Sequence, residues 1–341
     1  MLDTRTSLKG ARGRWRRAFY AGFLYQGRLL SVTGGDDVTR TGASSDTAMF
    51  DHQDWDNGHW GIQTWLERTA WRTLRNTSYG RSADANEEAH HALFEDPLLK
   101  QVYLMDIALF IGAEHTSYHA VSGMMRCAPD ELAQMQLGTQ VFDECRHYEV
   151  FCKRMADMGV TPDKRKALIE RYTTPALRSF YDLILEQVDK QDFYAASIAQ
   201  NLIMEGMAYP VYRYEIRYWS RIDPGLSRTI QGAFADEAHH VGFGEAINKA
   251  HLQRLGTGDR NRIQKLTQQF STLMRQTFEE IINRYIGLYQ ECANQYMDIM
   301  GDVEIFRGRK MAEMTEEDQA RTVLQEIQEE HRARLGRLGL A

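Results

Sequence analysis

The sequence predicts an all-α protein built around a helical bundle. Proline is scarce, with 6 residues in 341, whereas residues that favour helices, such as Leu, Ala, Met, Gln, Glu and Arg, are common. Two short strings, Asp143–His147 and Asp236–His240, each contain Glu-x-x-His. Because residues three apart lie on one face of a helix, each string would present a carboxylate and an imidazole in the same direction. A hydrophobic content of 43% is enough for one large core.

Residues 1–58 are expected to form an irregular N-terminal arm, because turn-forming residues gather at 34–37 and 41–45. The arm is basic, but the apolar stretch after its basic residues is too short for a signal peptide, so we interpret it as solvated or partner-binding. Residues 59–310 are expected to form the helical domain. Residues 311–341 are highly charged and are expected to form a surface helix or a loosely docked tail.

Proline and N-cap signals set the order of the first helices. An Asp-Pro pair begins a helix expected over 96–127, and a Pro-Asp pair begins one expected over 129–159. Prolines then punctuate a short helical region from 162 to 175.

A third long helix is expected over 177–220, with a break near Asp192 left open. Pro210 lies inside it and should kink the helix or free a backbone carbonyl. An Asp-Pro pair at 223–224 begins the fourth helix of the bundle, and residues 258–300 are expected to form another long helix.

Two further glutamates complete a candidate metal site. Glu114 and Glu205 lie in apolar stretches, one upstream of each Glu-x-x-His string and at similar intervals. Buried acids are costly unless they are paired or bind a metal, and one Glu-x-x-His string alone is a weak signal. Four carboxylates and two imidazoles on four helices make a di-metal site in a bundle. The expected metal ligands are Glu114, Glu144, His147, Glu205, Glu237 and His240.

This set of donors favours two iron ions. Carboxylates are hard donors that can bridge two cations, and one imidazole per ion leaves positions open for oxygen. Zinc would use fewer carboxylates, and magnesium or calcium would have little use for imidazole. A pair of manganese and iron stays an alternative.

The residues beside the ligands are expected to support the two imidazoles. Metal-bound histidines usually donate their second N–H to a carboxylate. By the pseudo-twofold symmetry of the two strings, we expect Asp143 to hold His240 and Asp236 to hold His147. Arg146 would pair with one of these aspartates.

These motifs resemble the ferritin-like di-iron carboxylate proteins, in the branch of ribonucleotide reductase small subunits and bacterial multicomponent monooxygenase and epoxidase hydroxylases. The string Asp143–His147 carries that branch's Asp-Glu-x-Arg-His signature, and Asp236–His240 matches it except at His239, where Arg is usual. The resemblance covers about residues 95–255. It implies a ferritin-like four-helix bundle core with additional helices, and a homodimer.

The sequence departs from several specialised relatives. Phe151 stands where radical-generating subunits usually have tyrosine, and Ala233 stands where arylamine N-oxygenases have an extra histidine ligand. Ser117 and Gln200 stand where R2-like ligand-binding oxidases have a Val–Tyr crosslink. Tyr209 replaces the threonine that multicomponent hydroxylases typically have.

The favoured function is a monooxygenase-type di-iron enzyme that uses O2 to oxidise a small organic substrate, with electrons from a separate reductase or ferredoxin. Residues one turn from the ligands are expected to line the substrate pocket, namely Phe110, Ser117, Gln140, Phe151, Asn201 and Tyr209. The alternatives are a radical-generating subunit or R2-like oxidase that serves a partner protein, and iron storage or a purely structural bundle.

Composition narrows the partners and the compartment. A net charge of -6 gives no reason to expect nucleic acid. No apolar run reaches the roughly 18 residues of a membrane helix, so no membrane association is expected. The 4 cysteines form no C-x-x-C pair, which favours a reducing cytoplasm.

Overall fold

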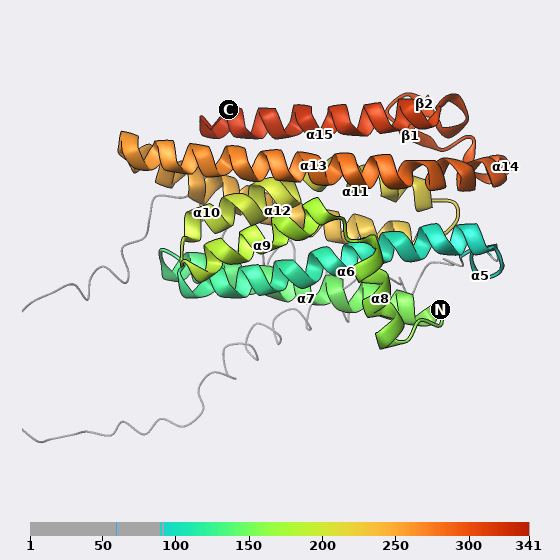
Figure 1. Ribbon diagram of the computed structural model, residues 1–341, viewed down its shortest axis with the longest axis horizontal. Helices are drawn as coiled ribbons and strands as arrows, with labels where there is room; N and C mark the ends of the chain where they lie inside the picture. Colours follow the sequence, from blue (N-terminus) through green and yellow to red (C-terminus); the bar gives the residue numbers. More distant parts are fainter. Residues whose placement is uncertain (1–58, 60–88, 91, 341) are drawn as a thin grey trace, which may run out of the picture. The chain divides into compact units, whose positions relative to one another are not determined.

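The computed structural model describes residues 59, 89–90 and 92–340 (Figure 1). The arm expected over 1–58 and the start of the helical region near Trp60 lie outside these residues. None of the described helices is long and apolar enough to cross a membrane.

The first half of the bundle is the antiparallel pair α6 (Pro97–Arg126) and α7 (Glu131–Asp157), preceded by the short α5 (Ala92–Glu95). The expected start signals are confirmed. The Asp96 side chain accepts hydrogen bonds from the backbone of Leu98 and Leu99 at 2.7 and 2.9 Å, and Pro97 follows it. Asp130 caps α7 in the same way.

The region expected to hold one long helix is divided at the break near Asp192. After α8 (Pro162–Tyr172), helix α9 (Pro175–Asp189) ends, and Gln191 takes a φ of 55°. The Asp192 side chain then caps a new helix through the backbone N–H of Ala195. That helix runs through α10 (Phe193–Ser197), the π-helix η3 (Ile198–Glu205) and α11 (Gly206–Trp219).

The second half of the bundle pairs this composite helix with α12 (Pro224–Arg254), which Asp223 caps. The helices α6, α7, η3–α11 and α12 therefore form the four-helix core expected from the two repeated patterns. Long apolar side chains, including Met105, Phe243 and Phe270, are fully buried around it.

Additional helices cover the core. The long helix α13 (Thr257–Gln295) is followed by α14 (Met297–Met300) and a small antiparallel hairpin of β1 (Glu304–Phe306) and β2 (Arg309–Lys310). This hairpin was not predicted from the sequence. A single 3-10 turn, Met311–Glu313, leads to α15 (Glu316–Leu338).

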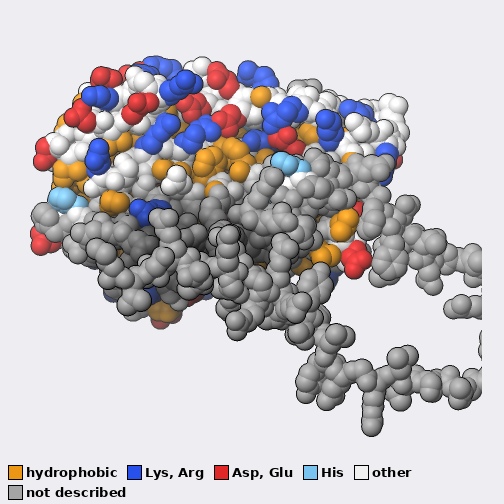
Figure 2. Space-filling view, turned by 180° about the vertical axis from the view of Figure 1, so that it is seen from behind, with side chains coloured by type: hydrophobic (Ala, Val, Ile, Leu, Met, Phe, Trp, Pro, Cys, Tyr) orange, Lys and Arg blue, Asp and Glu red, His pale blue; other side chains and the backbone are white. Residues whose placement is uncertain are grey.

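Helix α15 lies alongside α13 and also contacts α11 (Figure 1). Its apolar side chains Val323, Ile327 and Leu335 are buried, so this charged segment is a packed helix and not a loosely docked tail. Its outer face mixes acidic and basic side chains in the upper part of Figure 2. The charge seen in the sequence is therefore the solvated face of an amphipathic helix.

Candidate metal centre

The six residues expected to bind metal come together inside the four-helix core. Their side-chain donor atoms form two groups, and within each group the atoms lie within 4.8 Å of one another. Both groups contain Glu144 and Glu237; the first adds Glu114 and His147, and the second adds Glu205 and His240. All six side chains are buried. Two groups that share two carboxylates are the arrangement that two adjacent metal ions require.

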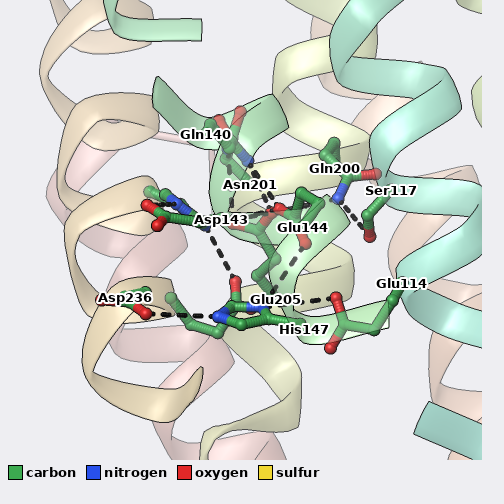
Figure 3. Close-up of polar contacts among 12 residues, drawn as sticks. Glu114, Ser117, Gln140, Asp143, Glu144, His147, Gln200, Asn201, Glu205 and Asp236 are labelled. Atoms are coloured by element: carbon green, nitrogen blue, oxygen red, sulfur yellow. Dashed lines mark hydrogen bonds and ion pairs between the residues drawn. The ribbon is translucent and has the colours of Figure 1, made fainter. Parts of the chain in front are cut away.

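The two imidazoles are held in the crossed manner that the sequence predicts, and Figure 3 shows the contact between His147 and Asp236. Nε2 of His147 lies 3.2 Å from Oδ2 of Asp236, and Nε2 of His240 lies 3.4 Å from Oδ2 of Asp143. If each Nε2 carries the proton, each Nδ1 keeps its lone pair for a metal ion. Among the described residues, Nδ1 of His147 has no hydrogen-bond partner, and it lies 3.5 Å from a carboxylate oxygen of Glu114.

The support of the two aspartates is not symmetric. The Arg146 guanidinium donates to Asp236 and lies 3.9 Å from Asp143, so one cation reaches both carboxylates. His239 stands at the equivalent position of the second string. Burial and the adjacent His240 lower the pKa of His239 to about 4, so its imidazole is neutral at neutral pH.

The buried carboxylates of the cluster would be stabilised by added positive charge. Burial, and after it the neighbouring glutamates, raise the pKa of Glu144 well above its usual range, and burial with a nearby carboxylate raises that of Glu205 to about 8. Burial alone would lower the pKa of His147, but Glu114 and Asp236 raise it to about 10. The clustered carboxylates therefore favour bound positive charge. Two divalent ions would supply this charge, so the residues fit a di-metal centre.

The π-helix η3 explains how Glu205 is oriented. Gln200 and Asn201 both donate to the Glu205 carboxylate, at 3.0 and 3.3 Å. An α-helix aligns residues four apart, whereas a π-helix, with its i→i+5 pattern, also aligns residues five apart. The π-turn therefore brings two amides onto the face that carries the carboxylate, which a regular helix would not do.

A third amide reaches the same carboxylate from α7. Nε2 of Gln140 donates to Glu205 at 2.8 Å and lies 3.3 Å from Glu144, while its oxygen accepts from Asn201 at 3.0 Å. Gln140 thus joins one glutamate from each half of the bundle. Gln140 and Asn201, which the sequence placed in the substrate pocket, instead belong to this hydrogen-bonded network (Figure 3).

Immediately after Glu205, the helix backbone depends on the C-terminal helix. Pro210 has no N–H to give to the carbonyl of Gly206, four residues earlier. Nη1 of Arg334, from α15, donates to that carbonyl at 2.9 Å, and its Nε donates to Glu245 at 3.2 Å. The sequence predicted a freed carbonyl or a kink at Pro210, and the structure shows which side chain satisfies the carbonyl.

An apolar cavity of about 150 Å³ begins next to the cluster and extends away from it between α6, α9, α11 and α13, with Val323 of α15 in its wall. Its lining contains Ala113 and Met204, which directly precede Glu114 and Glu205 in sequence. An engineered cavity of this size binds a molecule as large as benzene.

Of the six residues expected to line the substrate pocket, only Phe110 lines this cavity. Phe151 lies behind it, with the two rings stacked 4.7 Å apart. Ser117 accepts a hydrogen bond from Gln200 at 2.9 Å. Tyr209 donates to the backbone carbonyl of Glu237 at 3.3 Å. These side chains point inward as expected, but they contact the cluster's supports or pack behind the cavity wall.

Solved structures share this arrangement of helices. An R2-like ligand-binding oxidase with aerobically reconstituted Mn/Fe cofactor is 15% identical, with a TM-score of 0.53, over 84% of this chain and 98% of that chain. A point variant of R2-like ligand-binding oxidase, with anaerobically reconstituted Mn/Fe cofactor, is also 15% identical, with a TM-score of 0.54, over 84% and 98% of the two chains. The chain has the ferritin-like fold, and at this level of identity the likeness shows nothing beyond the fold. No protein-family model matches the chain, and no curated protein matches its sequence.

Tyr212, which the ligand spacing did not single out, lies between the cluster and the cavity. Tyr212 lines the cavity, and its phenol lies close enough to the cluster that, after burial, all four glutamates raise its pKa. Tyr212 follows Glu205 by seven residues, two helical turns on the same face, so a wider search along the helix could have found it. Tyr181, a second cavity residue, lies on α9, where no ligand spacing pointed to it.

Proposed function

We propose that this protein is a di-iron oxygenase that uses O2 to oxidise a small apolar substrate held in the cavity beside the metal centre. The observation that supports this most is the shared wall: Tyr212 lines the cavity and also lies in the electrostatic field of the four glutamates. A substrate in the cavity would be one side chain away from the ions. The apolar lining would exclude water from the reacting atoms.

The ligand set favours iron. Four carboxylates and one imidazole per ion suit Fe(II), and a pair of manganese and iron would use the same donors. When bound, the two ions would supply the electrons and the open positions that oxygen activation needs. Gln140, Gln200 and Asn201 would keep the Glu205 carboxylate oriented as the charge on the centre changes.

The overall reaction would insert one oxygen atom into a C–H bond. The substrate R–H, O2, two electrons and two protons give R–OH and water. We propose that a separate reductase or ferredoxin supplies the two electrons, because the sequence contains no flavin, nicotinamide or iron–sulfur motif.

Metal loading tests the centre directly. Anaerobic addition of Fe(II), followed by removal of free iron, should leave about two ions per chain, and this protein should consume O2 when a chemical reductant is present. Glu144→Gln removes a charge common to both donor groups and should lower the bound iron. Glu149→Gln, on the exposed side of the same helix, is the matched control and should bind iron as the wild type does. If Glu144→Gln kept two ions and the same O2 uptake, the proposed centre would be wrong.

A radical-generating subunit is the second candidate, and Tyr212 is the observation that favours it. Tyr212 lies in the cavity wall, and after burial all four glutamates raise its pKa. Its side chain could lose one electron and its phenolic proton to the centre. Exposure of the iron-loaded protein to O2 would then give a persistent tyrosyl signal in electron paramagnetic resonance. Loss of that signal in Tyr212→Phe, with two ions still bound, would favour this candidate.

A further inference from the structure

The cavity has a polar end, formed by two buried acids. Asp106 and Glu215 are 1% and 7% exposed and both line it. The Asp106 carboxylate is fully paired, with Trp219 donating from Nε1 at 2.7 Å and the Tyr289 hydroxyl donating to its other oxygen. Oε2 of Glu215, by contrast, is buried and has no hydrogen-bond partner among the described residues. A buried acceptor without a donor is unusual and costly.

This end lies away from the metal centre. Asp106 precedes Glu114 on α6 by eight residues, and Glu215 follows Glu205 along η3 and α11 by ten. With a helical rise of 1.5 Å per residue, both acids are roughly 12 to 15 Å from the cluster. Asp106 and Glu215 lie close to each other, and Glu114 and Glu205 also lie close to each other. The two helices therefore run in opposite directions, and both acids lie on the same side of the cluster.

The composition of the wall decides which chemical group could occupy this end. In the part of the chain that the structure describes, the cavity lining contains no Lys, Arg or His. Burial, and then Asp106, raise the pKa of Glu215 well above its usual range, so in the free protein this acid keeps its proton. A ligand carboxylate would meet two acids and no cation. A basic amine would instead take the proton from Glu215 and form an ion pair with it, supplying the N–H donors that Oε2 lacks.

We propose that Glu215 binds the amine of an apolar aliphatic substrate, whose hydrocarbon end lies against Met204 and Tyr212 at the metal end of the cavity. The claim that the ligand is a substrate rests on the proposed function, whereas the claim that it binds rests on the cavity alone. The proposal predicts that a carboxylate binds at this end of the cavity less tightly than an amine does. The C–H bond to be oxidised would lie at the end of the ligand's hydrocarbon chain opposite to the nitrogen.

Binding of three matched probes tests the proposal. We suggest calorimetric titration of the full-length, Fe(II)-loaded protein under argon with n-octylamine, n-octanol and n-octanoate. The amine should bind about 10-fold to 100-fold more tightly than the alcohol, as a charged hydrogen bond is worth more than a neutral one, and octanoate should bind most weakly. In Glu215→Gln, which keeps the shape of the side chain, the amine should bind no better than the alcohol. Glu149→Gln removes a carboxylate from the exposed side of α7, outside the cavity, and should keep the wild-type order.

Two results would overturn the proposal: octanoate binding as tightly as the amine, or an amine preference that survives Glu215→Gln. The order of the three probes on the wild type needs no variant, so the test holds even if Glu215→Gln folds poorly. Iron content and O2 uptake measured on the same samples separate the two proposals. If the wild type shows no amine preference but has intact iron and O2 uptake, only the amine site is refuted, whereas a wild-type amine preference without O2 uptake refutes only the oxygenase.

Discussion

The contact between Arg334 and Gly206 gives a quantitative test of how the C-terminal helix supports the metal-bearing helix. Arg334 is 4% exposed, and its donor to the Gly206 carbonyl replaces the N–H that Pro210 lacks. If this reading is correct, the two residues are coupled: the arginine matters because the proline is there. A double-mutant cycle with Arg334→Met and Pro210→Ala measures that coupling.

The expected magnitudes follow from the burial of the groups. Arg334→Met keeps apolar bulk but leaves a buried carbonyl unpaired, which should lower the free energy of unfolding by about 1–3 kcal/mol. In the Pro210→Ala background the backbone N–H of residue 210 can reach the carbonyl, so the same substitution should cost about 1 kcal/mol less. Arg337, which donates to the same Glu245 carboxylate with a side chain 54% exposed, is the matched control. Arg337→Met should cost about 0–1 kcal/mol in either background.

Urea unfolding in the presence of a chelator provides the assay, because it reports the stability of the protein without metal. A change in midpoint at constant slope gives the difference in free energy. The reasoning is refuted if Arg334→Met costs the same with proline and with alanine at position 210. It is also refuted if Arg334→Met costs no more than Arg337→Met, because the buried carbonyl would then have no role.

Three further predictions concern the cluster and α15. Asp236→Asn weakens the hydrogen bond to His147 and should lower metal affinity about 10-fold to 100-fold, measured by competition with a chromogenic chelator; unchanged affinity would contradict the support role. Gln140→Leu removes a donor to Glu205, so it should slow or weaken metal loading and lower stability by about 1–3 kcal/mol, and an unaffected urea midpoint would count against the network. Burial, with Arg334, lowers the pKa of His331 from 6.5 to about 4, so stability should fall as the pH drops through that window, where the unfolded chain takes up the proton first. His331→Gln should reduce this loss in urea titrations at pH 4 to 7, and an unchanged pH profile would show that His331 does not contribute.

The parts of the fold that the sequence predicted are those encoded by nearby residues. An Asp-Pro pair or an aspartate N-cap acts within one helical turn, so the starts of α6, α7 and α12 could be placed closely. The ligand pattern is local in the same sense, because Glu-x-x-His fixes two donors on one helix face. The hairpin at 304–310 has few residues and no strong turn signal, and the sequence did not predict it.

The cavity was not predicted because it depends on contacts between distant segments. Walls of the cavity come from α9, α13 and α15, none of which carries a ligand motif. Spacing along α6, α7 and η3 shows that a side chain points inward, but not whether it meets a cavity or another polar group. Gln140 and Asn201 point inward and are held by hydrogen bonds with Glu205. The π-turn adds a further obstacle, since a search with period 3.6 misplaces the residues within it.

The two halves of the bundle differ in how regular their helices are. The first half, α6 and α7, is two regular helices with an intact Asp-Glu-x-Arg-His string. The second half contains the π-turn, which ends at Glu205, and His239, which adjoins His240. It also contains Pro210, which leaves the carbonyl of Gly206, next to Glu205, to Arg334. Irregular backbone is costly unless its surroundings hold it in place, and here amide side chains and Arg334 do so. Both halves supply three of the proposed ligands and both line the cavity, so the second half differs in how its ligand helix is held and not in how much of the site it supplies.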